Sequence, residues 1–141
     1  MNTKQLSEAI SYLIPEMIRG AQMDFFIKSR ITQTQMMVLA AIRAQGRCPM
    51  SRLADEMKVT RATMSGIVGR LARVGYVARQ ANPKDRREVW IQVAPAGEKF
   101  MNEFRGVIRE RWGKVLAGLS PQEIQSFFAI VQKLRMTVEK I

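Results

Sequence analysis

Short polar side chains lie close together at the start of a helix predicted over residues 61–73. Thr63 and Ser65 carry hydroxyls that can donate or accept a hydrogen bond, and Ala62 is small enough to allow close approach. Arg61 adds a planar guanidinium that can reach a guanine edge or a phosphate. Side chains of these types at the first turns of a helix match the groups that base pairs expose in the DNA major groove.

A second cluster, Lys84-Asp85-Arg86-Arg87, lies at the tip of a predicted hairpin. A narrow minor groove concentrates negative potential and attracts an inserted arginine. Asp85 would repel a phosphate, but a carboxylate can hold a guanidinium in one orientation through a bidentate pair. We therefore expect Asp85 to orient an arginine, with Arg87 preferred over Arg86. The alternative is a surface ion pair without function, worth ~0–1 kcal/mol.

Positive charge is concentrated in the same part of the chain. The 141 residues carry a formal net charge of +11, and residues 47–93 hold ten basic and four acidic side chains. This uneven distribution predicts a polyanion partner. Arg70 and Arg73, deeper in the predicted helix, are expected to meet phosphates, and the alternative for both is an ordinary solvated helix face.

The elements around these residues are expected in a fixed order. A helix over 50–57 and a tight turn precede the helix 61–73, whose N-cap is Thr60, and strands over 76–80 and 88–93 follow. Apolar residues at helical spacing form the expected core side of the two helices: Leu53, Ala54, Met57, Val59, Met64, Ile67, Val68 and Leu71. Helix, turn, helix and hairpin in this order predict a winged helix-turn-helix, in a chain that is mainly α with a small β-hairpin wing.

Long helices are expected on both sides of this motif. Residues 1–31 show an apolar stripe that Pro15 should bend or split, and the last helix begins with Ser120 as N-cap and Glu123 at N3. We expect one domain over 1–141, with 32–97 as the DNA-binding region and 1–31 and 98–141 as dimerisation helices. Their large apolar faces exceed what the motif can cover, and the alternative is a monomer whose end helices pack on the motif.

Composition excludes several other classes of protein. The chain has no histidine and a single cysteine, Cys48, so an intramolecular disulfide and the commonest metal ligand and general base are absent. We find no phosphate loop, metal set or nucleophile–base pair, and therefore expect neither an enzyme nor a cofactor. No transmembrane segment or signal sequence is apparent, which predicts a cytoplasmic protein without a membrane partner.

Several of these pieces together resemble the MarR family of bacterial transcription regulators. They are Leu53-Ala54 through Val59-Thr60-Arg61, Arg70-Leu71, Gly75-Tyr76-Val77, the wing Asn82-Pro83-Lys84-Asp85-Arg86-Arg87, and Val93-Ala94-Pro95-Ala96-Gly97. The resemblance implies a winged-helix homodimer that binds a pseudo-palindromic operator on double-stranded DNA, commonly as a repressor. It also implies release by a small aromatic or phenolic acid that binds between the dimerisation and DNA-binding parts.

Three residues depart from the family pattern. Lys58 stands where the family often has glycine in the turn, so we expect a strained turn or a phosphate contact there. Gly66 stands where many relatives carry a basic residue, which removes a DNA contact. Cys48 is expected in a loop, away from the position of the family's peroxide-sensing cysteine, so a structural thiol is favoured over a redox role.

Residues for an effector are only weakly indicated. Six side chains on helices could line the inter-domain cleft, each with core or surface as the alternative: Tyr12, Met17, Arg19, Met36, Arg43 and Trp112. An arginine among them could pair with an aromatic carboxylate. The competing function for the whole chain is a basic architectural or RNA-binding helical protein that reads no sequence.

Overall fold

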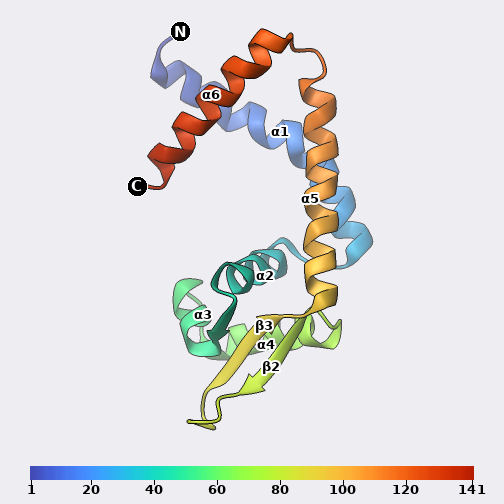
Figure 1. Cartoon of the computed structure of the whole chain (residues 1–141), viewed down its shortest axis with the longest axis vertical. Coiled ribbons are helices and arrows are strands. Elements are labelled where there is room, and N and C mark those ends of the chain that lie inside the picture. The colour runs from blue at the N-terminus through green and yellow to red at the C-terminus, as the bar shows by residue number, and fades with distance from the viewer. The chain divides into compact units, whose positions relative to one another are not determined.

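The computed structural model of the chain describes all residues, 1–141. It is mainly helical, with a small antiparallel sheet (Figure 1). In chain order the elements are α1 (Thr3–Ser29), α2 (Gln33–Gln45), β1 (Arg47–Pro49), α3 (Met50–Glu56), α4 (Arg61–Arg73), β2 (Val77–Ala81), β3 (Val89–Val93), α5 (Pro95–Leu116) and α6 (Pro121–Val138). The predicted fold class, a winged helix-turn-helix with long flanking helices, is confirmed.

Two compact units make up the chain. One holds Met1–Gly20 and Ile108–Ile141, which are the first part of α1, the second half of α5, and α6. The other holds Ala21–Val107 and contains the helix-turn-helix and the hairpin. Both α1 and α5 contribute to each unit. The sequence predicted dimerisation helices over 1–31 and 98–141 and a DNA-binding region over 32–97. These bounds differ by about ten residues from those of the two units.

Side chains at two helix starts satisfy backbone groups that the helix itself leaves unpaired. Thr32 Oγ1 accepts from the Gln35 backbone N–H at 3.1 Å, and Gln35 Oε1 accepts from the Thr32 backbone N–H at 3.0 Å. Ser120 and Glu123 form the same reciprocal pair, and the backbone hydrogen bond from Ser120 lowers the pKa of Glu123. The capping box at Ser120 and Glu123 was predicted from the sequence.

Pro15 does not divide the first helix. The helix α1 is one α-helix from Thr3 to Ser29 with Pro15 inside it. Proline removes a single backbone donor, and the hydrogen bonds of the turns on either side keep the helix together. Of the two outcomes expected for this residue, a split helix is therefore wrong.

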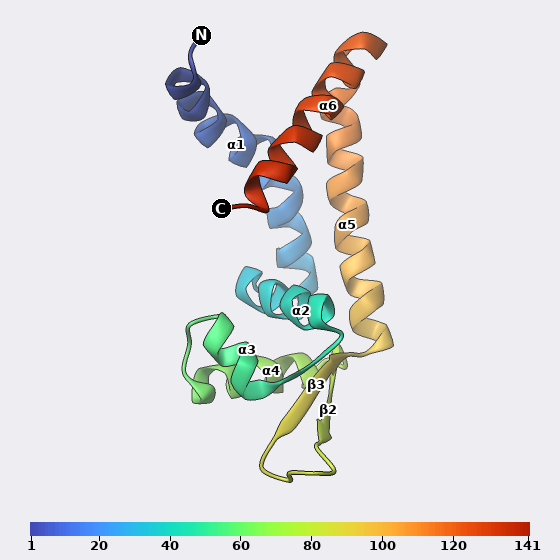
Figure 2. The same ribbon diagram turned by 60° about the vertical axis from the view of Figure 1, so that its left-hand side comes forward.

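A third strand in the sheet was not predicted. The strand order is β1-β3-β2, and both pairings are antiparallel. Figure 2 shows β2 and β3 side by side. Cys48 lies in β1 opposite Ile91, so its predicted loop position is wrong. The side chain is fully buried, and burial, with a smaller contribution from the Glu56 carboxylate, raises the pKa of the Cys48 thiol. A buried, protonated thiol packs as a small apolar side chain, which supports a structural role.

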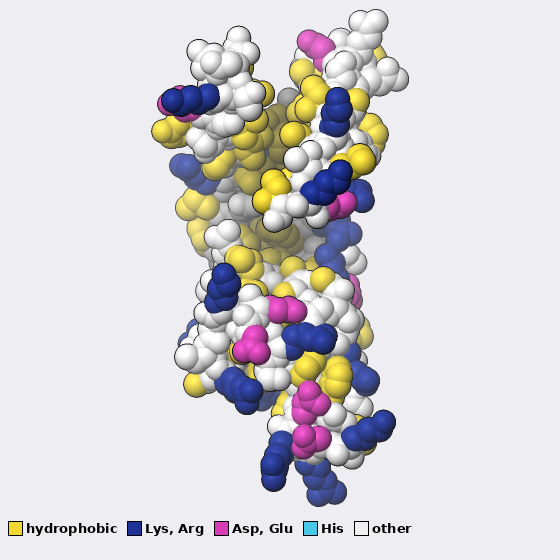
Figure 3. All heavy atoms as spheres, turned by 90° about the vertical axis from the view of Figure 1, so that its left-hand side faces the viewer, with side chains coloured by type: hydrophobic (Ala, Val, Ile, Leu, Met, Phe, Trp, Pro, Cys, Tyr) yellow, Lys and Arg dark blue, Asp and Glu magenta, His cyan; other side chains and the backbone are white.

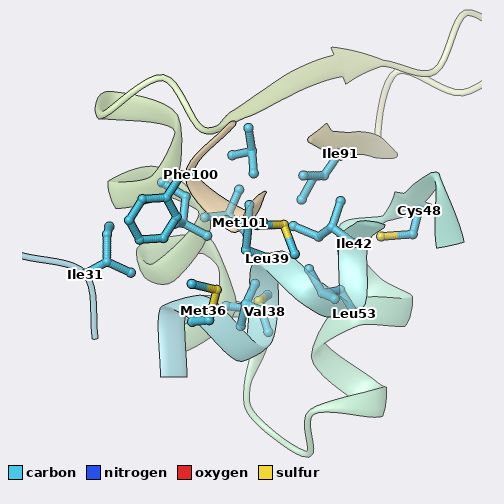
Figure 4. Close-up of a cluster of buried hydrophobic side chains, with 14 of the residues drawn as sticks. Ile31, Met36, Val38, Leu39, Ile42, Cys48, Leu53, Ile91, Phe100 and Met101 are labelled. Atoms are coloured by element: carbon cyan, nitrogen blue, oxygen red, sulfur yellow. The ribbon is translucent and has the colours of Figure 1, made fainter. Parts of the chain in front are cut away.

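The core of residues 21–107 joins α2, α3 and α4 to the sheet. Leu53 and Ala54 of α3 and Met64, Val68 and Leu71 of α4 are buried as predicted, whereas Met57, Val59 and Ile67 are only half-buried at its edge. Leu39 and Ile42 of α2 and Ile91 of β3 are also fully buried, and Phe100 and Met101 close the cluster (Figure 4). The face of α4 opposite this core is left free.

Lys58 holds the turn between α3 and α4 in a left-handed conformation. Its φ is +54°, and its backbone N–H donates to Asp55 O at 3.2 Å. This conformation costs a non-glycine residue roughly 1–2 kcal/mol, because the Cβ atom approaches a carbonyl oxygen. The strain predicted for this turn is confirmed.

We expect Lys58→Gly to stabilise the protein by about 0.5–1 kcal/mol, because relief of that strain exceeds the added entropy of the unfolded chain. Urea unfolding of the variant measures the change. Lys99→Gly, in the exposed part of α5, serves as the matched control and should destabilise by about 1 kcal/mol. Destabilisation of equal size in both variants would contradict strain at Lys58.

None of the helices combines the length and the hydropathy needed to span a bilayer.

Candidate nucleic-acid interface

Helix α4 presents a polar face because its cap and its core side are both fixed. Thr60 Oγ1 accepts from the Thr63 backbone N–H at 3.1 Å, which confirms Thr60 as the N-cap. Met64, Val68 and Leu71 anchor one side of the helix in the core. The opposite side leaves the expected base-facing and phosphate-facing residues exposed, namely Arg61, Ala62, Thr63, Ser65, Arg70 and Arg73.

The Thr63 hydroxyl is held by its neighbour. Thr60 Oγ1 and Thr63 Oγ1 are 2.9 Å apart, with the Thr60 hydroxyl donating and Thr63 accepting. In this arrangement the Thr63 proton is left free to donate to an acceptor beyond the helix. Acceptors of that kind, such as guanine O6 and N7 or thymine O4, line the major groove.

The loop at the tip of the wing is ordered by its own side chains. Asn82 Nδ2 donates to Glu88 Oε2 at 2.7 Å, and Asn82 Oδ1 accepts from the Lys84 backbone N–H at 3.0 Å. Lys84, Asp85, Arg86 and Arg87 are all exposed, and Figure 3 shows Lys and Arg side chains at this tip. Three cations therefore project from a loop of restricted conformation.

Asp85 acts on the backbone of the loop and not on a guanidinium. Its Oδ1 accepts from the Arg87 backbone N–H at 3.0 Å, and no ion pair joins Asp85 to an arginine. The expected bidentate pair is therefore wrong in this structure. The short aspartate side chain reaches the N–H two residues on, which forms an Asx-turn, more readily than it reaches the end of an arginine. Asp85 positions Arg87 through the loop.

Helix α4, the expected recognition helix, and the loop of the wing share one concave surface. A hollow of about 520 Å³ is lined by Arg61 and Ser65 of α4 and by Asp85 and Arg87 of the wing loop, together with Met50, Ser51, Glu88 and Val89. Segments that lie far apart in the sequence thus line one cleft. Its two arginines come from different elements, one from the helix and one from the wing, as expected for contacts to adjacent grooves of one duplex.

Solved structures share this fold. The transcriptional regulator Tm0710 from Thermotoga maritima aligns with a TM-score of 0.81 at 23% identity, covering 96% of this chain and 96% of that one. A single-residue mutant of MepR from Staphylococcus aureus, solved bound to an oligodeoxyribonucleotide, aligns with a TM-score of 0.72 at 21% identity, covering 98% and 99%. The sequence model of the MarR family matches residues 31–89, from the start of α2 into β3. The central part of the chain, residues 31–89, is therefore similar to the MarR family.

Curated relatives of the chain include helix-turn-helix regulators. The HTH-type transcriptional repressor MdtR of Bacillus subtilis is 26% identical over 125 residues, which cover 89% of this chain and 77% of that protein. The uncharacterised regulator YkoM of the same organism is 21% identical over 100 residues, which cover 71% of this chain and 65% of the relative.

One contact between the wing and the recognition helix was missed by sequence reasoning. Arg79 of β2 donates from Nη2 to Ser65 O in α4 at 3.3 Å. Gly69 leaves room for this side chain, since an added Cβ there would lie 3.4 Å from Arg79 Nη2. A signal was present, because Arg79 shares its sheet face with buried Val77 and Ile91. A cation on the helix-facing side of a strand lies within reach of the helix that packs there, even when its side chain stays exposed.

The weakly indicated effector residues are divided between the two units of the chain. Tyr12, Met17, Arg19 and Trp112 belong to one unit, and Met36 and Arg43 belong to the other. Met36 is a core residue with 7% of its surface exposed, which agrees with the core position expected as the alternative for this side chain. Helical position alone could not separate a core methionine from one that lines a cleft.

The other members of this set have protein neighbours or lie open. Arg43 Nη1 lies 4.0 Å from Glu98 Oε2, Trp112 packs against Phe127 at 6.5 Å between ring centroids, and Met17 O accepts from Arg111 Nε at 3.0 Å. Tyr12 and Arg19 are exposed. None of the six lines the hollow between α4 and the wing.

Proposed function

We propose that this protein is a homodimeric, sequence-specific DNA-binding regulator of the MarR type, acting as a repressor at a pseudo-palindromic operator. Helix α4 enters the major groove, where Arg61, Ala62, Thr63 and Ser65 face the base edges. The wing follows the backbone into the adjacent minor groove with Lys84, Arg86 and Arg87, and Asp85 shapes the loop that carries them. Arg70 and Arg73 meet phosphates.

The observation that carries this proposal is the cleft between α4 and the wing. A protein that binds a polyanion without reading its sequence needs exposed cations but no particular groove. Here the short hydroxyl side chain of Ser65 lies in the same concave surface as Arg61 and Arg87. A short hydroxyl side chain can contact a base edge while the arginines on either side of it contact phosphates. This arrangement favours sequence readout over the architectural or RNA-binding alternative.

A second copy of the chain is the proposed partner of the terminal helices. Every residue of α6 is exposed, and its apolar stripe includes Ile124, Phe127, Val131 and Leu134. In α1, Leu6, Ile10 and Leu13 are similarly exposed, and Figure 3 shows hydrophobic side chains over both helices. A contiguous apolar surface of this kind marks an interface. A two-fold dimer would place two recognition helices ~34–36 Å apart, one turn of duplex.

Removing the last helix by ending the chain after Ser120 should abolish the dimer and weaken operator binding together. Phe128→Glu tests the same surface without truncation, because its side chain is 62% exposed and makes little contact within one chain. Gln122→Glu, outside the apolar stripe of α6, adds the same charge as a control. Sedimentation equilibrium should show a monomer for Phe128→Glu and a dimer for Gln122→Glu. A dimeric truncation would exclude α6 from the interface.

The proposed release signal is a small aromatic or phenolic acid. The support for this signal is the family resemblance. By linkage, a ligand that binds more tightly to a conformation with low DNA affinity lowers the affinity of the protein for DNA. A thermal-shift screen of aromatic acids tests it: an active acid should raise the melting temperature of the free protein and lower its affinity for DNA.

Selection of bound duplexes from a random pool tests the DNA proposal. The enriched sequences should contain an inverted repeat whose half-site centres lie about one helical turn apart. A pool that remains random after repeated rounds, with the protein still retaining DNA, would support the architectural alternative instead. A parallel selection with RNA should yield no enriched motif.

A further inference from the structure

A second hollow lies on the wing, away from the cleft described above. It measures about 340 Å³. Its walls come from all three strands and the turn after β2, and include Arg47, Gln80, Ala81, Pro83, Lys84 and Trp90. Volumes of about 300–1,000 Å³ are typical of small-molecule sites. The hollow is therefore large enough for a compact ligand.

The alternation of side chains along the strands explains its position. Cys48 and Ile91 are paired across β1 and β3, and both are buried against the helices. Their neighbours Arg47 and Trp90 must therefore point to the other face of the sheet, as does Gln80, the partner of Trp90 in β2. An indole is thus presented on a sheet face that no helix of residues 21–107 covers.

The electrostatics of this hollow favour an anion. The Arg47 guanidinium lies 4.8 Å from the centroid of the Trp90 ring, which holds the cation over the aromatic surface. Lys84 supplies a second positive charge, and no carboxylate lines the hollow. Glu88 accepts from Nδ2 of Asn82, which lines the hollow, and the Glu88 side chain itself lines the cleft beside α4.

We propose that this hollow binds a small planar aromatic anion. The aromatic ring packs against Trp90 and Pro83, and the anionic group pairs with Arg47 and Lys84. An aromatic wall with two unopposed cations suits a ligand that is both flat and negatively charged. The inference gives the proposed aromatic acid a place on the chain and to that extent rests on the proposed function.

A ligand here would act on the loop of the wing. Lys84 contributes its side chain to the hollow and its backbone N–H to Asn82 Oδ1. The same loop continues into Asp85 and Arg87, whose hydrogen bond shapes the tip. Occupation of the hollow therefore restrains the segment that carries the proposed minor-groove arginines, although no ligand atom touches them.

Titration of the whole chain with 2-naphthoate, followed by the indole N–H signals in nuclear magnetic resonance, tests the site without any DNA. The chain has two tryptophans, so Trp90→Phe assigns the two signals. The Trp90 signal should shift and saturate, while the Trp112 signal stays in place. Neutral 2-naphthamide should bind at least about tenfold more weakly, since it lacks the charge-assisted contacts.

Arg47→Ala and Lys84→Ala should each weaken 2-naphthoate by about tenfold. Arg105→Ala, on an exposed position of α5, removes the same charge elsewhere and should leave the affinity unchanged. Equal binding of naphthoate and naphthamide, an unshifted Trp90 signal, or an equal response to inorganic phosphate would overturn the proposal. Because no DNA is present, these results are independent of whether an operator is found.

Discussion

Arg87→Ala is expected to lower affinity for duplex DNA by about 10- to 100-fold, or about 1–3 kcal/mol. The Arg87 side chain lines the cleft with Arg61 and Ser65, and its backbone N–H is held by Asp85 Oδ1 at 3.0 Å. An arginine on an ordered loop loses little conformational entropy when it enters a groove. Its removal should therefore lose most of the binding free energy of the contact. Fluorescence anisotropy on the selected operator, at constant salt, measures the change.

Three further variants serve as controls for Arg87→Ala. Arg105→Ala removes an equal charge from α5 and should change the affinity little beyond general electrostatics. Asp85→Asn keeps an oxygen that can accept from the Arg87 N–H, whereas Asp85→Ala does not, so only the alanine variant should approach the loss seen for Arg87→Ala. Sedimentation should show every variant as a dimer. Full affinity of the Arg87→Ala variant would remove the wing from the proposed interface.

Gly97→Ala is expected to destabilise the fold by about 1–3 kcal/mol. Gly97 lies in the first turn of α5, at the end of the hairpin, and Ala94 donates its backbone N–H to Tyr76 O at 2.9 Å just beside it. An added Cβ would overlap the Tyr76 carbonyl and lie 2.9 Å from Val93 Cγ1. Backbone on one side leaves nothing flexible to move away, so the helix start itself must shift.

Gly106→Ala, in the same helix, is the matched control. Nothing lies within 4 Å of a Cβ added there, and alanine is the better helix former, so we expect it to be neutral or to stabilise by up to ~1 kcal/mol. Urea unfolding of both variants gives the comparison. Equal free energies of unfolding for Gly97→Ala and the parent chain would contradict the close packing of Gly97 on the backbone of Tyr76.

Local signals in the sequence predicted most of the elements, because each has a physical cause within a few residues. Thr32 and Ser120 accept from N–H groups three positions on, and Gly75, with φ of +81°, ends the turn after α4. The strands of the hairpin were predicted within one residue of β2 and β3. The strand β1 was missed because three residues that end in Pro49 show no alternation, and their pairing with β3 is made over forty positions away.

The candidate site was predicted less completely for the same reason. The exposure of Thr63, Ser65 and Arg87 follows from helical spacing and from a charged hairpin tip. That the helix and the wing share a cleft, and that Arg79 bridges them to Ser65 O, depends on how the sheet packs on α4. Such contacts between distant segments leave only indirect traces in a sequence, here a cation on the helix-facing side of a strand.

Competition between the selected operator and random duplex of the same length, at physiological salt, tests the central claim most directly. A protein that reads bases through α4 and the wing should prefer the operator by ~10³-fold or more. Thr63→Ala should reduce this preference while leaving affinity for random DNA nearly unchanged, because the hydroxyl is proposed to contact bases and not phosphates. Equal affinity of the parent chain for operator and random DNA would contradict sequence-specific regulation.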